Sequence, residues 1–196
     1  KPTKILNKSN PPFYKWYEDG VTNTCYNALD FHIDQGKGDK TALIYDSPIT
    51  GNKSKFTYEE LRSKVSKFAG ALKVQGVNKG DRVIIYMPMI PEAVVAMLAC
   101  ARIGAIHSVV FGGFASNELA SRIDDSKAKL LVTASCGFEP GRTVEYKPLV
   151  DEAIKQAQHK ISKMILFQRK GHEVKLNAPM EISWDEAHVN AKDTDC

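Results

Sequence analysis

The pattern of hydrophobic and polar residues is strongest between residues 81 and 135, where apolar runs alternate with helical patterns. Residues 83–86 form a short, nearly all-apolar and mostly β-branched run, which is typical of a strand covered on both faces. Residues 93–103 are apolar on almost every side and predict a deeply buried helix, with Pro91 in its first turn. A second apolar strand is expected over residues 106–111. A strand, a helix and a strand within about thirty residues is the size of a βαβ unit, whose strands run parallel.

The same pattern repeats further along the chain. Residues 116–125 predict another helix and residues 130–134 another strand, followed by a helix over 148–158 and a fourth strand over 164–167. Strands that alternate with helices indicate a parallel sheet. We therefore expect an α/β fold with an open, mostly parallel sheet flanked by helices.

The loops after the predicted strands are the first place to look for ligand binding, because open α/β sheets bind ligands beyond the carboxyl ends of their strands. Gly112 and Gly113 follow the second strand, and two adjacent glycines let a ligand or another chain segment approach the backbone closely. A tight turn into the next helix explains them equally well. In the loop over 135–146, Arg142 beside Gly141 could hold a phosphate through its guanidinium, although a solvated arginine is the commoner case.

A capping box and a hairpin are expected before this central region. Thr57 and Glu60 have the spacing of a capping box, which begins an amphipathic helix that ends at Gly76. Residues 41–46 and 54–56 predict the hairpin.

The carboxyl-terminal part contains weaker signals. Residues 174–176 are expected to pair briefly as a strand. Ser183 and Glu186 form a second capping box, which begins a short helix that fades by Asn190. The last residues are polar and linker-like, so we expect the chain to derive from a longer protein.

The amino-terminal part predicts an arm rather than part of the core. Residues 1–12 are rich in Lys, Asn, Ser and Pro, and they lead into an aromatic cluster of Phe13, Tyr14, Trp16 and Tyr17. We expect this cluster to dock on the domain surface, since aromatic side chains dominate buried contacts; a platform for stacking a nucleotide is the alternative. We divide the chain into an arm and docking segment over residues 1–36 and an α/β subdomain over residues 37–196.

Composition and charge narrow the function classes only slightly. Hydrophobic residues make up 43% and charged residues 26% of the chain, as in ordinary globular proteins. The net charge of +4 is too weak to indicate nucleic-acid binding. No stretch reaches the roughly 18 apolar residues of a transmembrane helix, and no triad of catalytic side chains or metal-ligand spacing is recognisable. We therefore expect neither catalytic residues nor a metal site within this chain.

Four cysteines without metal spacing or a disulfide framework favour a reducing compartment. Cys100 lies in the predicted buried helix, so we expect it to be inaccessible together with Met97 and Leu98. A thiol reagent should react first with Cys25 or Cys196.

One long segment resembles a known family. The segment from Tyr86 to Phe114 begins Tyr-Met-Pro-Met-Ile-Pro-Glu-Ala-Val-Val and ends Val-Val-Phe-Gly-Gly-Phe. It is similar to short-chain acyl-CoA synthetases of the adenylate-forming superfamily. Residues 16–23 and 27–30 resemble the amino-terminal region of the same enzymes, and residues 135–154 are closer to propionyl-CoA than to acetyl-CoA synthetases.

The resemblance implies a two-step reaction on a short-chain carboxylate, propionate or, as the alternative, acetate. The carboxylate attacks the α-phosphate of ATP to form an acyl-adenylate and pyrophosphate, with Mg²⁺ neutralising the triphosphate, and the thiol of coenzyme A then displaces AMP. By the same resemblance, Gly112 and Gly113 contact coenzyme A, and Arg142 approaches its phosphates. Glu139 stands where many acetyl-type members have a further arginine, so a clamp of two arginines is not expected.

Several motifs of the family are absent from these 196 residues: the Ser/Thr/Gly-rich phosphate loop, the aromatic-Thr-Glu segment, the ribose-binding aspartate and the domain with the catalytic lysine. We therefore expect the amino-terminal portion of an enzyme, inactive by itself and able to self-associate through uncovered apolar surface. A natural binding or interaction module without catalysis is the alternative. Eukaryotic propionyl-type relatives imply the mitochondrial matrix, and bacterial ones the cytoplasm.

Overall fold

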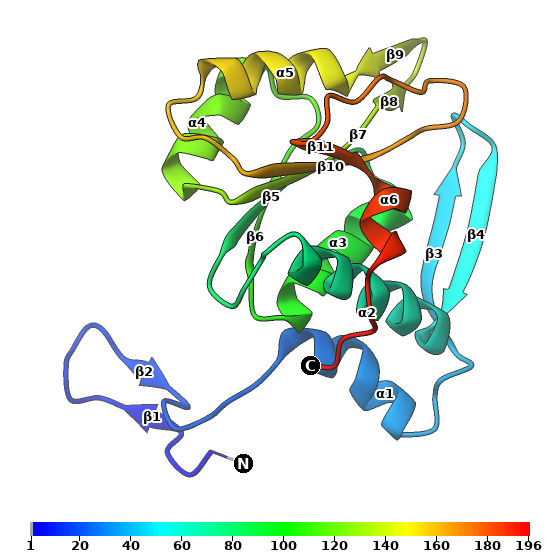
Figure 1. Cartoon of the computed structure of the whole chain (residues 1–196). Coiled ribbons are helices and arrows are strands. Elements are labelled where there is room, and N and C mark those ends of the chain that lie inside the picture. The colour runs from blue at the N-terminus through cyan, green and yellow to red at the C-terminus, as the bar shows by residue number, and fades with distance from the viewer. Residues whose placement is uncertain (1) are drawn as a thin grey trace.

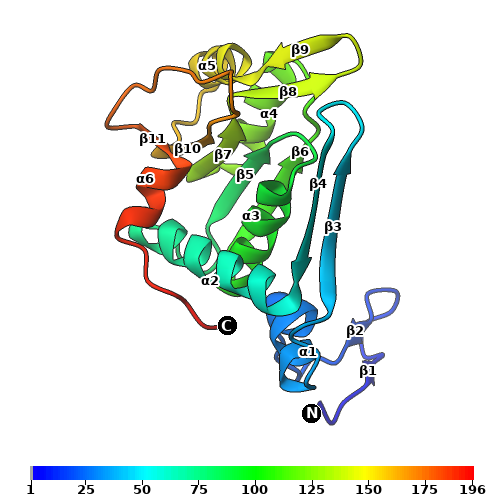
Figure 2. The same cartoon turned by 90° about the vertical axis from the view of Figure 1, so that its right-hand side faces the viewer.

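The computed structural model describes residues 2–196 and places a five-stranded parallel sheet between two layers of helices (Figure 1). The helices are η1 (Tyr26–Asp30, π-helical), α1 (Phe31–Asp34), α2 (Tyr58–Val74), α3 (Pro91–Arg102), α4 (Ser116–Ser126), α5 (Tyr146–Gln156) and α6 (Trp184–Val189). The strands are β1 (Leu6–Asn7), β2 (Lys15–Trp16), β3 (Thr41–Ser47), β4 (Asn52–Thr57), β5 (Arg82–Tyr86), β6 (Ile106–Val110), β7 (Leu130–Ala134), β8 (Cys136–Glu139), β9 (Arg142–Glu145), β10 (Lys163–Phe167) and β11 (Glu181–Ser183). Helices α4 and α5 cover one face of the sheet, α2, α3 and α6 cover the other, and the predicted β3–β4 hairpin stands beside α2 (Figure 2).

The sheet has the strand order β11-β10-β7-β5-β6, and all four pairings are parallel. Its register places one residue of each strand in a single row across the sheet: Ile182, Ile165, Val132, Ile85 and Val109. This confirms the α/β fold with an open parallel sheet that the alternation of strands and helices predicts.

Successive side chains of the central strands point to opposite faces of the sheet, so the hydrophobic core has two parts, one on each face. Val83 and Ile85 of β5 belong to the cluster with α2 and α3, whereas Ile84 and Tyr86 belong to the cluster with α4 and α5. All four side chains are fully buried. A strand covered on both faces needs no polar side, which is why this run lacks the alternation of a surface strand.

Both predicted capping boxes are confirmed. Thr57 Oγ1 accepts a hydrogen bond from the backbone N–H of Glu60 (3.2 Å), and the Glu60 carboxylate accepts one from the N–H of Thr57 (2.8 Å). Ser183 and Glu186 make the same two bonds at the start of α6, at 3.1 and 2.8 Å. Each box provides hydrogen-bond acceptors for backbone N–H groups that have no partner within the first turn of the helix. Residues within one helical turn therefore determine where both helices begin.

The carboxyl-terminal part departs from the prediction in two places. The expected loop over 135–146 is mostly a β-hairpin of β8 and β9, paired from Cys136↔Glu145 to Glu139↔Arg142. Residues 174–176 form no strand, and β11 instead pairs with β10 at the edge of the sheet. Short strands of mixed polarity carry no clear period, so only tertiary pairing identifies them.

One prediction about burial is wrong, and another holds for only one of its two residues. Met97 and Leu98 of α3 are only partly buried at the rim of the core, although Cys100 is fully buried as expected. A helix that covers one face of a sheet has neighbours on only part of its circumference, so its flanks remain accessible. Cys25 is also fully buried, which leaves Cys196 as the exposed cysteine of the chain.

Strand β6 is an edge of the sheet, and within residues 2–196 it pairs with β5 alone. Ile106 and Val109 on this strand are each 55% exposed. The strand ends at Val110, one residue earlier than predicted. An unpaired edge with apolar side chains is a surface that another chain segment can use; self-association through it stays a prediction.

The arm is a small antiparallel ribbon of β1 and β2 that projects away from the body (Figure 1, lower left). Backbone N–H groups of Thr3 and Lys4 donate to the Asp19 carboxylate at 2.8 and 3.2 Å, which closes the ribbon on itself. Phe13 is 73% and Trp16 63% exposed, so the expected docking of the aromatic cluster on the domain surface is wrong. Hydrogen bonds within the ribbon hold it together, and its aromatic side chains are half to three-quarters exposed.

The longest helix, α2, has 17 residues. Across residues 2–196, no helix combines the length and the apolar character needed to cross a bilayer.

Candidate functional site

The order of the strands reverses between β5 and β7. Strand β6 lies on one side of β5, whereas the later strands β7, β10 and β11 lie on the other. The chain leaving β5 enters α3 on one face, and the chain leaving β7 enters the β8–β9 hairpin and α5 on the opposite face (Figure 1). Ligands of such sheets bind at this switch point, beyond the carboxyl ends of the strands. We call this region, residues 87–90, 111–114, 135–146 and 168–172, the carboxyl edge.

Two tyrosines form the floor of the carboxyl edge. Tyr86, the last residue of β5, donates from its hydroxyl to the carbonyl oxygen of Phe114 (2.8 Å), which holds the loop after β6. Its ring lies against that of Tyr146, with centroids 4.9 Å apart. Burial raises the pKa of Tyr86, and burial together with the nearby Tyr86 and Glu139 raises the pKa of Tyr146 to about 12. Both hydroxyls are therefore neutral near pH 7 and act only as hydrogen-bonding groups.

The predicted glycine pair packs on this floor. A Cβ atom built on Gly112 would lie 2.1 Å from Tyr146 Oη, and one built on Gly137 of β8 would lie 2.8 Å from the same oxygen. The Tyr146 hydroxyl is thus held between two glycines. A Cβ atom on Gly113 would lie 2.6 Å from a ring carbon of Phe111. Close approach of the chain to itself therefore accounts for Gly112, and a contact of either glycine with coenzyme A stays a prediction.

Arg142 lies at the tip of the β8–β9 hairpin. Gly141, with φ +76°, makes the turn in the left-handed region that glycine tolerates. The register places Arg142 opposite Glu139, and its Nε donates to Glu139 Oε2 at 2.7 Å. The Arg142 side chain is still 71% exposed. Because an exposed ion pair of this kind adds little stability, an anionic ligand can replace Glu139 at small cost.

Arg169 is a second cation at the carboxyl edge, and the sequence analysis missed it. Its guanidinium carbon lies 4.7 Å from the centroid of the Phe138 ring, and its backbone N–H donates to Ser135 Oγ at 2.9 Å. Arg142 and Arg169 thus contact consecutive residues of β8, Glu139 and Phe138, whose side chains point to opposite faces of the hairpin. The rule about strand ends could have found Arg169, because it follows the correctly predicted fourth strand by two residues.

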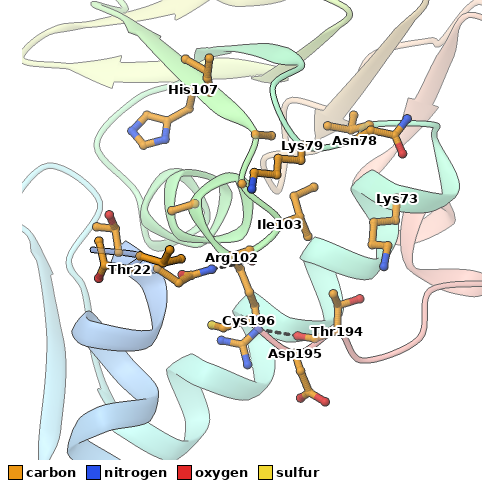
Figure 3. Close-up of a pocket in the computed structure, with 18 residues that line it drawn as sticks. Thr22, Lys73, Asn78, Lys79, Arg102, Ile103, His107, Thr194, Asp195 and Cys196 are labelled. Atoms are coloured by element: carbon orange, nitrogen blue, oxygen red, sulfur yellow. Dashed lines mark hydrogen bonds between the residues drawn. The ribbon is translucent and has the colours of Figure 1, made fainter. Parts of the chain in front are cut away.

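The largest of three cavities among residues 2–196 lies elsewhere, at the amino ends of β5 and β6; Figure 3 shows the residues that line it. It measures about 910 Å³ and is lined by Lys73, Lys79 and His107 together with residues 194–196. Burial lowers the pKa of His107. Cavities of about 460 and 150 Å³ lie beside α6 and behind the β8–β9 hairpin. The predicted residues Gly112, Gly113 and Arg142 line none of these three cavities.

The carboxyl edge suits a phosphate better than a metal ion. Guanidinium groups such as those of Arg142 and Arg169 match phosphate oxygens in charge and geometry. In the described part of the chain, the one cluster with metal-type spacing comprises Cys25, Asp30 and Cys196, beside the largest cavity. Mg²⁺ prefers oxygen ligands, so a cluster with two thiols does not fit it.

The strand order is flavodoxin-like, with Arg142 and Arg169 in the segments that follow β7 and β10, and it defines an α/β protein that binds ligands beyond the carboxyl ends of its strands. The chain belongs to the AMP-binding enzyme family, whose model matches residues 31–195. A second model, for the acetyl-coenzyme A synthetase N-terminus, matches residues 1–28. The resemblance to the adenylate-forming superfamily is thereby confirmed.

Within this family, the chain is similar to several individual acyl-CoA synthetases. The chain is 55% identical over 195 residues to human acyl-CoA synthetase short-chain family member 3, mitochondrial, covering 99% of this chain and 28% of that protein. It is 48% identical over 186 residues to acetyl-coenzyme A synthetase of Streptomyces avermitilis, covering 95% and 28%. The structure of acetoacetyl-CoA synthetase from Streptomyces lividans aligns with a TM-score of 0.84 at 24% identity, covering 98% and 29%, which shows a common fold. The chain thus spans less than a third of the length of these relatives.

Proposed function

We propose that this chain is the amino-terminal, coenzyme A-facing part of a short-chain acyl-CoA synthetase that ligates propionate to coenzyme A with ATP. The observation that carries the proposal is the 55% identity over 195 residues to acyl-CoA synthetase short-chain family member 3. The confirmed family, AMP-binding enzymes, supports the use of ATP. The mitochondrial names of the mammalian relatives support a mitochondrial matrix location, with the cytoplasm as the alternative.

The proposed reaction has two steps, and this chain serves mainly the second. In the first step the carboxylate displaces pyrophosphate from ATP, with Mg²⁺ on the triphosphate, to give the acyl-adenylate. In the second step the thiol of coenzyme A displaces AMP. The cations of the carboxyl edge suit the phosphates of coenzyme A, whereas the described residues offer no oxygen-rich cluster for Mg²⁺.

The proposed coenzyme A contacts are Gly112 and Gly113 in the loop after β6 and Arg142 on the hairpin, with Arg169 added as a second cation. The exposure of the Arg142 side chain and its weak pairing with Glu139 support this role. On binding, a phosphate would take the place of the Glu139 carboxylate. A charge-assisted hydrogen bond of this kind contributes about 1.5–3 kcal/mol.

Substitution of Arg142 in the full-length enzyme tests the site. Arg142→Ala should raise the KM for coenzyme A about ten- to hundredfold, which is the ratio that this contact energy predicts. Pyrophosphate exchange without coenzyme A should stay unchanged, because the first step does not use this arginine. Arg122→Ala, on the exposed side of α4, is the matched control and should change neither value. An unchanged KM for coenzyme A in folded Arg142→Ala would remove Arg142 from the site.

Acetate is the second candidate substrate, because a relative that is 48% identical is named acetyl-coenzyme A synthetase. The kcat/KM ratio of propionate to acetate in the full-length enzyme decides between them. A ratio well above one supports propionate, and a ratio at or below one returns the assignment to acetate.

The isolated chain should form no acyl-adenylate. Its 196 residues lack the phosphate loop and the catalytic lysine of the family. Incubated with ATP, Mg²⁺ and propionate, it should release pyrophosphate at the background rate, and propionate-dependent release would contradict this expectation. The alternative, a non-catalytic interaction module, requires that the intact protein in its native source has the mass of this chain alone.

A further inference from the structure

Two cysteines and a buried ion pair meet at the carboxyl end of α3. Arg102, whose side chain is 1% exposed, donates to the two carboxylate oxygens of Asp30 at 2.7 and 2.9 Å. The same guanidinium donates to the Sγ atom of Cys25 at 3.4 Å. The thiol of Cys196 donates to Asp30 Oδ2 at 3.6 Å. Both sulfur atoms therefore contact one ion pair, and the two sulfurs and a carboxylate oxygen lie within 4.8 Å of one another.

The segment that carries Cys196 is positioned by contacts that do not involve its thiol. The backbone N–H of Thr194 donates to Ser66 Oγ at 2.9 Å, and the Ser66 hydroxyl donates to the Thr194 carbonyl at 3.0 Å. A Cβ atom on Gly70 would lie 1.9 Å from the carbonyl oxygen of Lys192, so this segment lies directly on α2. Figure 3 shows Thr194 and Cys196 beside the Arg102 side chain. The proximity of the two sulfurs is thus part of the packing of the chain.

We propose that Cys25 and Cys196 are a redox-active thiol pair that a peroxide oxidises to a disulfide. Cys196 is exposed and Cys25 is fully buried, so a small oxidant meets Cys196 first. The Cys196 sulfur attacks one oxygen of hydrogen peroxide, the O–O bond breaks, and a sulfenic acid and one water form. The Cys25 sulfur then attacks the Cys196 sulfur, the S–O bond breaks, and the second water leaves. Two thiols lose two protons and two electrons, and one peroxide becomes two waters.

The geometry suits the second step. A disulfide requires the two sulfurs to approach to about 2.05 Å. Cys25 is fixed in the core, whereas the exposed side chain of Cys196 can rotate toward it. Burial raises the pKa of the Cys25 thiol, and the Arg102 guanidinium beside it offsets only part of this effect.

A metal ion is a poorer fit to the same cluster. A third ligand would have to come from Asp30, whose carboxylate already accepts two hydrogen bonds from Arg102. Taking this carboxylate away would leave a buried guanidinium without an opposite charge, which is strongly unfavourable.

The groups that face the Cys196 sulfur are Cys25, Tyr26, Asp30 and Arg102. Burial, followed by the neighbouring Cys25, raises the pKa of Cys196 to about 12. The resting pair is therefore a dithiol near pH 7, and oxidation should accelerate about tenfold per pH unit between pH 7 and pH 9 as the thiolate becomes available.

The test counts free thiols in the 196-residue chain after treatment with hydrogen peroxide. The reduced chain has four free thiols, and the oxidised, denatured chain should retain two. Mass spectrometry of a non-reduced digest should find the peptides of Cys25 and Cys196 joined, lighter by two hydrogen atoms. Dithiothreitol should restore all four thiols.

Two variants distinguish the pair from non-specific oxidation. Cys196→Ser, at an exposed position that should not disturb folding, should retain its three thiols after the same treatment. Cys136→Ser removes a buried thiol outside the cluster and should still lose two thiols. The proposal is overturned if the native chain keeps four thiols, if the only product joins Cys196 of two chains, or if Cys196 remains a sulfenic acid while Cys25 stays free.

Discussion

Substitution of the two adjacent glycines of the carboxyl edge should have unequal effects on stability. In Gly112→Ala the new Cβ atom would lie 2.1 Å from the hydroxyl oxygen and 2.9 Å from Cζ of Tyr146. Tyr146 cannot move away, since Gly137 already lies against the other side of its hydroxyl and the residue is 5% exposed. We expect Gly112→Ala to lower the free energy of unfolding by about 1–3 kcal/mol, the usual range for an overpacked core.

Gly113→Ala is the matched control. Its Cβ atom would lie 2.6 Å from the ring of Phe111, a side chain that is 70% exposed and free to rotate into solvent. The change should therefore stay within about 0.5 kcal/mol, as for other surface substitutions. A second control introduces Gly112→Ala into the Tyr146→Leu variant, which has no hydroxyl at this position. In that background Gly112→Ala should lower the free energy of unfolding by less than it does in the chain with Tyr146.

Urea unfolding followed by circular dichroism measures these differences, with an unchanged m-value required for each comparison. Equal losses in Gly112→Ala and Gly113→Ala would refute the packing explanation. In the full-length enzyme, a higher KM for coenzyme A in stable Gly113→Ala would support the proposed ligand contact independently of packing.

Three further predictions concern buried or exposed titratable groups. Asp30→Asn should lower the free energy of unfolding in urea by about 3–5 kcal/mol, because buried Arg102 then lacks an opposite charge. The double variant with Arg102→Met should recover most of this loss. Burial alone would raise the pKa of Asp30, but hydrogen bonds and charge from Arg102 lower it below its unfolded value. The contribution of the ion pair to the free energy of unfolding is therefore present above about pH 4 and should be lost as the pH falls through the native pKa. Urea unfolding below pH 4 checks this loss. The native pKa of Tyr146, about 12, lies above its unfolded value. The contribution of the neutral Tyr146 side chain to the free energy of unfolding should therefore be present below about pH 10 and lost between pH 10 and pH 12. Tyr146→Phe has no hydroxyl to ionise and should not show this loss. A thiol reagent should label Cys196 in the native chain and label Cys100 only after unfolding; early labelling of Cys100 would contradict its burial.

The candidate site was predictable only in outline. The strand-end rule points to the loop with Gly112 and to the segment with Arg142, because both follow apolar runs that are recognisable locally; their role in binding stays a prediction. The ion pair of Arg142 with Glu139 depends on the turn at Gly141, and the packing of Gly112 depends on Tyr146, which is distant in sequence. Neither contact has a local signature.

The sequence by itself determined the elements whose stabilisation is local or periodic. Both capping boxes, the amphipathic helix α2 and the apolar strands β5, β7 and β10 follow from side chains within a few residues of one another. These signals depend on backbone geometry alone, so they do not require knowledge of the partners.

Only the tertiary structure decided how those elements meet. The order of strands, the pairing of β11, the exposure of the aromatic arm and the contact of Cys25 with Arg102 join residues far apart in the chain. The free energy of such contacts comes from burial and from hydrogen bonds formed across the fold, and a short window of sequence contains neither partner's position. The elements with local or periodic signals were therefore predictable from the sequence, whereas the proximity of Cys25 to Cys196 and the side-chain partners of Arg142 and Arg169 became visible only when the chain was folded.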